Sequence, residues 1–385
     1  MKSKLFQFLL DKRFVALCWF AVTLAVPFKH VFLTSIHNNY LIFKHTFYHT
    51  ILQQSLYSHC PYHYDTNHYG PIFGFLFAPF ALLPDQIGCL LWVCCISLSL
   101  FLAIYHLPID WKYKAIIYYM TMNEMFTSLI SMQTNALIAA LIIASFIAIR
   151  KEKDGWAACF IALGFFIKLY SVVGLCFFFF SRHKLKFIGY LIGWSVVFFV
   201  LPMPISSPSF IIQSYGDWYQ SLVAKNMENA ISSYQDISVI GMMRRISGNR
   251  DLSNLIVLIP AIIIFALQYV KIKLYNDFRY QLALLASTLL FVVLFSSGSE
   301  SPTYIIAMTG VAIWFVLQES PYRKYVIALL VFALVLTSFS PTDLMPKVCR
   351  IFVREYSLKA LPCLCVWLVL VYQIIRAGKG FKKKL

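Results

Sequence analysis

Residues 86–105 read QIGCLLWVCCISLSLFLAIY, an uncharged and predominantly apolar segment. About 20 such residues let a helix cross the hydrocarbon core of a bilayer. Further apolar segments predict helices along the whole chain. The complete set of predicted spans is 14–34, 86–105, 114–131, 134–149, 156–167, 169–180, 187–203, 253–270, 280–296, 302–318, 322–339 and 357–376. The pattern predicts an all-α, polytopic transmembrane helical bundle of about 10–13 spans.

The composition agrees with this class. Of the 385 residues, 60% are apolar and 13% are charged, whereas soluble domains carry about 45–50% apolar and about 25% charged residues. So few charges would not cover the surface of a soluble protein of this size. Most of the 10 cysteines lie in apolar runs, where cysteine behaves as a small hydrophobic residue.

The basic residues predict an orientation. The net charge is +17, and most of the 33 lysines and arginines lie in the terminal segments and in alternate short connections. The positive-inside rule then places both termini in the cytoplasm, in a multi-pass protein of the plasma (inner) membrane. We read the first span as retained, because the apolar run lacks a small-residue cleavage site. The expected partner of the basic excess is therefore the lipid bilayer, and no nucleic acid is expected.

We expect one transmembrane domain, 1–385, with long outer connections. The first outer loop, 35–84, is predicted to be ordered, with an amphipathic helix over 40–57 and a re-entering helix over 71–83. The second long outer loop is 204–252, and a third covers 340–356. The pair 156–167 and 169–180 is too short for two crossings, so a hairpin or broken helix is expected.

Ionisable groups within or beside apolar spans are functional candidates, because each costs roughly 2.5–3.5 kcal/mol on insertion scales. Lys168 stands at the tip of the predicted hairpin. It could hold a phosphate by charge-assisted hydrogen bonds, or be an interfacial lysine reaching for water. Glu124 could pair with a cation, serve as an acid, or make a structural hydrogen bond. Glu300, in SESPTYIIA, suits either a site or a helix N-cap.

Turn and loop residues supply further candidates. Gln133 and Asn135 in SMQTN could hydrogen-bond a sugar, although turns favour such residues without any function. Asp65 is the only carboxylate of the first loop, and it is a candidate catalytic base or a solvated loop residue.

Two groups of residues in the outer loops are candidates for binding ions, one for a phosphate and one for a metal. Arg244, Arg245 and Arg250 in the second loop could clamp a phosphate or form a solvated face. In the first loop His45 and His49 stand four apart on one helical face, but no third ligand is fixed by spacing. Neither a metal site nor another cofactor is therefore predicted.

The order of these motifs resembles glycosyltransferase family 87, polytopic enzymes of the GT-C type. NYLIF at 39–43 resembles the Asp-Leu-x-Val-Tyr that follows the family's first span, and LY at 56–57 resembles its later Leu-Tyr. YGPIFGFLFAPFALLP at 69–84 is similar to its Tyr-Pro-Pro-Leu-Phe…Ala-Pro-Leu…Leu-Leu-Pro run. QTN at 133–135 is similar to its Gly-Gln-x-Asn turn, and Lys168 falls where the family has Lys-x-x-Pro.

The resemblance implies an inverting hexosyltransferase that works on the outer face. It would use a polyprenyl-phosphate sugar, with mannose as a family-level expectation, and a glycan or glycolipid acceptor, and it would need no metal. Asn39 stands where the family has its expected catalytic aspartate, so the base would be Asp65 first and Glu300 second. The donor would be bound by Asn39, Lys168, Gln133, Asn135, His68, Tyr69, Arg244 and Arg245.

Three alternatives stay open at this level. A transporter or flippase would have symmetric halves and charges near the bilayer midplane, and an envelope polymer ligase would depend on its loop arginines. Because an amide takes up no proton at neutral pH, Asn39 also fits a non-catalytic family member.

Overall fold

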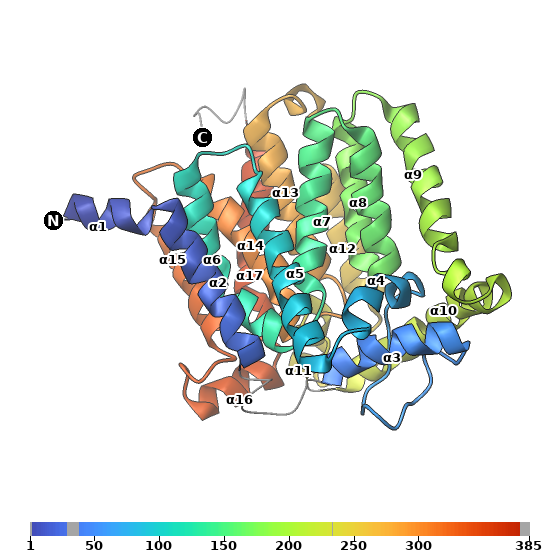
Figure 1. Ribbon diagram of the computed structural model, residues 1–385. Helices are drawn as coiled ribbons and strands as arrows, with labels where there is room; N and C mark the ends of the chain where they lie inside the picture. Colours follow the sequence, from blue (N-terminus) through green and yellow to red (C-terminus); the bar gives the residue numbers. More distant parts are fainter. Residues whose placement is uncertain (1, 29–37, 233, 378–385) are drawn as a thin grey trace. The chain divides into compact units, whose positions relative to one another are not determined.

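Helices are the only regular secondary structure in the part of the chain that the structure describes. The structure is a computed structural model that describes residues 2–28, 38–232 and 234–377 (Figure 1). Helix accounts for 76% of the structure, and no strand occurs in these ranges. The predicted all-α class is therefore confirmed, and the apolar helices are those of a helical membrane protein. The number of spans and the GT-C type stay predictions.

The helices fall into two compact units. Unit 1 comprises Met1–Ala16, Leu107–Ser128 and Asn226–Leu385, and unit 2 comprises Leu17–His106 and Leu129–Lys225. The chain thus passes repeatedly between the units, and the single domain stays a prediction.

The elements up to residue 205 are α1 (Lys2–Leu9), α2 (Lys12–Phe28), α3 (Asn38–Leu52), α4 (Ile72–Ala81), α5 (Asp85–Tyr105), α6 (Trp111–Ile130), α7 (Asn135–Arg150), α8 (Asp154–Ile167), η2 (Leu169–Phe180), α9 (Lys184–Val200) and η3 (Met203–Ile205). Those that follow are α10 (Pro208–Ile231), α11 (Val239–Ser247), α12 (Leu255–Leu267), η4 (Ile272–Leu274), α13 (Phe278–Leu294), η5 (Ser301–Thr303), α14 (Tyr304–Val316), α15 (Lys324–Phe332), η6 (Ala333–Phe339), α16 (Lys347–Glu355) and α17 (Ala360–Arg376).

Most predicted spans coincide with helices, and the differences lie at their ends and in the long loops. The predicted span 14–34 corresponds to α2, and its last six residues lie outside the described ranges. The amphipathic helix expected over 40–57 ends at Leu52, after which Gln53 takes a left-handed φ of 52°. The loop 204–252 contains α10 and α11, and 340–356 contains α16. Hydropathy missed these helices because they are not continuously apolar.

Two described helices are long and apolar enough to cross a membrane, Asp85–Tyr105 and the segment Lys184–Ile205, which comprises α9 and η3. A third span results if α16 and α17, bent by 60°, are taken as one. Many other helices are apolar but shorter. Helix α12 is apolar on every side, yet Ala261 is its only buried residue. Such a helix requires an apolar surrounding, which a bilayer provides.

The predicted hairpin over 156–180 is confirmed in unit 2. Helix α8 ends where Lys168 takes an extended conformation, and the 3₁₀-helix η2 folds back against α8. At Gly164 an added Cβ would stand 2.0 Å from the hydroxyl of Ser171, so the close approach requires glycine. Helix α7 packs against both arms of the hairpin, and α7 and α8 run side by side in Figure 1.

An aromatic cluster in unit 2 fixes α4, the helix that the sequence predicts to re-enter the membrane. Phe43 of α3 lies 4.8 Å from Phe73 and 5.5 Å from Phe77 of α4, measured between ring centroids. Phe77 in turn lies 5.1 Å from Trp92 of α5. Edge-to-face pairs of this kind stabilise beyond their buried area. The loop between α3 and α4, which carries the predicted base, is thereby anchored at both ends.

Candidate functional site

The break between α8 and η2 presents a lysine to the turn before α7. Lys168 Nζ donates a hydrogen bond to Asn135 Oδ1 at 3.0 Å, and Asn135 Nδ2 donates to Gln133 Oε1 at 2.7 Å. The ammonium also lies 4.7 Å from the ring centroid of Tyr170. Three residues singled out in the sequence therefore form one cluster, although Lys168 is 33 positions from Asn135.

The first loop meets this break at Gly70. The Gly70 amide donates to the carbonyl of Ile167 at 3.2 Å. A Cβ at Gly70 would stand 2.0 Å from the carbonyl oxygen of Phe166, which leaves no room for any larger residue. The contact places the segment that ends in His68 and Tyr69 beside the tip of the hairpin. Glycine at this position is thus a condition for assembling the site.

His68 is partly buried against α10. Its Nδ1 lies 2.9 Å from Ser221 Oγ, its Nε2 lies 3.3 Å from Thr66 Oγ1, and its carbonyl accepts from Trp218 Nε1 at 3.0 Å. Burial lowers the pKa of the imidazole to about 4; the cations Lys225 and Lys168 contribute in the same direction, and Asp65 opposes them. His68 is therefore neutral at neutral pH and can both donate and accept a hydrogen bond.

Asp65 lies at the edge of the same cluster. Its carboxylate is 3.8 Å from Lys225 Nζ of α10, and its side chain is 46% exposed. One carboxylate oxygen accepts from the amide of Thr66 at 2.9 Å. The position leaves the carboxylate accessible to a hydroxyl group of a substrate.

Asn39 and Tyr69 connect the loop to its surroundings. Asn39 Nδ2 donates to the carbonyl of Ser131 at 2.7 Å, which ties α3 to the turn that carries Gln133. Tyr69 stacks on Phe73 with ring centroids 4.7 Å apart, and its carbonyl accepts from Tyr57. The side-chain amide of asparagine can donate a hydrogen bond to this carbonyl, whereas an ionised carboxylate has no hydrogen to donate. The residue in the place of the expected family base therefore makes a structural hydrogen bond.

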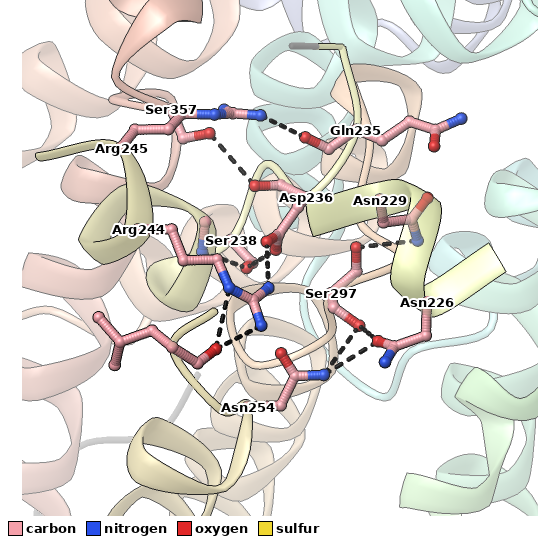
Figure 2. A network of polar contacts seen from close by, with 12 residues as sticks. Asn226, Asn229, Gln235, Asp236, Ser238, Arg244, Arg245, Asn254, Ser297 and Ser357 are labelled. Carbon is pink, nitrogen blue, oxygen red and sulfur yellow. Dashed lines mark hydrogen bonds and ion pairs between the residues drawn. The ribbon is translucent and has the colours of Figure 1, made fainter. Parts of the chain in front are cut away.

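The arginines of the second loop belong to a polar network in unit 1 (Figure 2). Arg244 forms an ion pair with Asp236 at 2.7 Å, and the two side chains are 8% and 2% exposed. Arg245 donates to the carbonyls of Ser232 and Gln235 at 2.9 and 2.6 Å. Both guanidinium groups hold the loop together, so the structural role is established and phosphate binding stays a prediction.

A pocket of about 600 Å³ opens next to these arginines within unit 1. Besides Arg244 and Arg245, its lining includes Arg250, Arg354 and Glu355. The guanidinium of Arg354 lies 4.6 Å from the ring centroid of Tyr234. The concentration of positive charge in a concave site suits an anionic group.

A buried ion pair joins two other features of unit 1. Lys359 Nζ contacts Glu124 Oε1 at 3.0 Å and Oε2 at 3.1 Å, and it donates to the hydroxyl of Ser301 at 2.9 Å. Glu300 precedes Ser301 and occupies the N-cap position of η5, where its amide donates to Thr303 Oγ1. Glu124 thus pairs with a cation. Sequence reasoning missed Lys359, because a lysine at the start of a span is typical of a membrane boundary.

The family model of glycosyltransferase family 87 matches residues 67–297, more than half of the chain. The chain belongs to this family. Family 87 membership makes it a membrane glycosyltransferase, with a sugar donor and an acceptor as substrates. No curated protein matches the sequence.

The family 87 match covers His68, Tyr69, the Gln133–Asn135 turn, Lys168 and the three arginines of the second loop. It begins after Asn39 and Asp65 and ends before Glu300. The match therefore does not test the resemblance at residues 39–43. It does not test the assignment of Asp65 or Glu300 as the base either.

Proposed function

We propose that this protein transfers a hexose, with mannose as the family-level expectation, from a polyprenyl-phosphate donor to a glycan or glycolipid acceptor. The transfer inverts the anomeric centre and takes place on the outer face of the plasma membrane, with both termini in the cytoplasm. The observation that carries the proposal is the polar cluster at the break between α8 and η2, where Lys168, Asn135 and Gln133 meet the first loop.

Each group has a chemical task in this proposal. Lys168 stabilises the negative charge that develops on the departing lipid phosphate, because a fixed cation in a partly buried site acts strongly there. The amides of Gln133 and Asn135 hydrogen-bond the sugar hydroxyls. Neutral His68 positions the donor through hydrogen bonds without adding charge.

The acceptor needs a proton acceptor as its hydroxyl attacks the anomeric carbon. Asp65 takes this role in our proposal, because its carboxylate is accessible and neighbours His68. Glu300 is the second choice. Asn39 holds the turn before α7 in place. The pocket lined by Arg244, Arg245 and Arg354 receives an anionic part of a substrate.

The test is transfer from a labelled polyprenyl-phosphate hexose by purified, reconstituted protein. Removing one electrostatic stabiliser costs about 10²–10³-fold in rate, and we expect this loss for Lys168→Ala. We expect Asp65→Asn to lose about 10²–10⁴-fold, the usual contribution of general base catalysis. The matched controls Lys186→Ala and Asp251→Asn, at exposed positions, should keep full activity.

The outcomes separate the alternatives. Full activity of both site variants would refute the residue assignment and leave the family reaction standing. No transfer by the wild type, together with substrate uptake into vesicles, would favour a transporter. A large gain of transfer in Asn39→Asp would indicate that the natural chain is an impaired or non-catalytic member.

A further inference from the structure

The first loop brings three residues of metal-ligand type together beside α3. They are His45, Cys60 and His63, and their ligand atoms all lie within 4.8 Å of one another. His45 comes from the middle of α3, whereas Cys60 and His63 come from the loop that follows it. The Cys-x-x-His spacing of the loop pair was visible in the sequence, but its approach to His45 depends on the fold.

Backbone carbonyls set the imidazoles in the state that a metal requires. His45 Nδ1 lies 2.9 Å from the carbonyl oxygen of Leu41, and His63 Nδ1 lies 2.6 Å from that of Asp65. A carbonyl oxygen only accepts hydrogen bonds, so both Nδ1 atoms carry the proton. Each Nε2 therefore keeps its lone pair for coordination. Such a hydrogen bond on the far nitrogen is what orients metal-bound histidines in general.

The surroundings of the cluster favour coordination. Cys60 is 3% exposed and His63 is 9% exposed, so competing water is largely excluded. The ring of His45 stacks on Tyr62 with centroids 4.9 Å apart and planes at 11°, which holds its orientation. The ring of His49, one turn along α3, lies 6.2 Å from that of His45. A fourth ligand, either His49 or a water molecule, is therefore within reach.

We propose that His45, Cys60 and His63 bind one Zn²⁺ ion. A thiolate and two imidazoles are the donor set that zinc prefers, with bonds of about 2.0–2.3 Å in a tetrahedron. Ligand atoms in such a site lie roughly 3.3–3.8 Å apart. Because the three are already within 4.8 Å of one another, binding needs only a small approach. The ion fastens the loop that carries Asp65 and His68 to α3, and its role is to order that loop. The zinc site does not rest on the proposed sugar transfer, and its test needs no activity.

The test is the zinc affinity of tag-free, detergent-purified protein, measured by equilibrium dialysis against buffered Zn²⁺ with metal analysis. We expect one ion per chain, and a loss of affinity of more than 10-fold in both Cys60→Ser and His63→Gln. The matched controls are His59→Gln and Cys349→Ser, both at exposed positions, and they should bind as the wild type does. Wild-type protein that binds no zinc, or equal binding by Cys60→Ser, would overturn the proposal.

A second measurement on the wild type avoids variants that fail to fold. With Co²⁺ in place of Zn²⁺, the Cys60 thiolate should produce a sulfur-to-cobalt charge-transfer band, and Zn²⁺ should remove it. Zinc should also protect residues 53–71 from proteolysis, and a chelator should reverse the protection. A cobalt spectrum without the charge-transfer band would contradict the proposed site. So would a rate of proteolysis of residues 53–71 that does not change when zinc is added.

Discussion

The buried ion pair of unit 1 allows a sharp test of how charges contribute to this fold. Lys359 and Glu124 are 4% and 0% exposed, with the ammonium 3.0 Å from one carboxylate oxygen and 3.1 Å from the other. The pair connects α6 to the start of α17, and the hydroxyl of Ser301 completes the environment of the ammonium.

Removing either charge leaves the other buried without compensation, which costs about 3–5 kcal/mol. We therefore expect that Lys359→Met and Glu124→Leu each lower the free energy of unfolding by this amount. In the double variant no charge is left uncompensated, and apolar side chains of similar volume replace a buried pair at little cost. We expect the double variant to be more stable than either single variant.

The exposed pair Arg182–Glu152 is the matched control. Its nitrogen and oxygen lie 2.7 Å apart, closer than in the buried pair, but the side chains are 69% and 48% exposed. Water screens such a pair, which contributes about 0–1 kcal/mol. Arg182→Met should therefore have a small effect, although distance alone would predict the opposite ranking.

The measurement is reversible denaturant unfolding in detergent or bicelles, followed by tryptophan fluorescence. The double-mutant cycle gives the coupling between Lys359 and Glu124 directly. If Lys359→Met is as stable as the wild type, or if the two single effects simply add, the reasoning from burial is refuted.

Three further outcomes are expected. Gly70→Ala should abolish transfer and lower the unfolding midpoint, because its Cβ would collide with the carbonyl of Phe166, and unchanged activity would contradict the close approach. The free energy of unfolding should fall by about 3 kcal/mol as the pH drops from 6.5 to about 4, because in this range the imidazole of His68 takes up a proton in the unfolded chain but not in the folded one. His68→Asn should not show this pH-dependent loss of stability when its unfolding is measured across the same range. Arg244→Ala should destabilise by about 3–5 kcal/mol in denaturant unfolding because it leaves the buried carboxylate of Asp236 without its countercharge, and an effect below 1 kcal/mol would exclude a structural ion pair.

Much of the helical architecture could be predicted from local sequence. The run 86–105 specifies α5, and the short apolar pair around Lys168 specifies the hairpin, because the hydropathy of neighbouring residues decides where a helix can be buried. Helices α10 and α16 could not be found in this way. Both carry charged and polar residues along their length, so neither forms the continuous apolar run by which a span is predicted.

The sequence by itself determined the class of this protein, its apolar helices and its candidate polar residues, because each depends on the transfer free energy of adjacent side chains. Only the tertiary structure decided which of these residues meet. It paired Lys168 with Asn135, gave Glu124 the unpredicted partner Lys359, and placed Cys60 and His63 beside His45. The physical reason is that a binding site is a set of contacts between distant positions, and packing geometry rather than sequence spacing fixes those contacts.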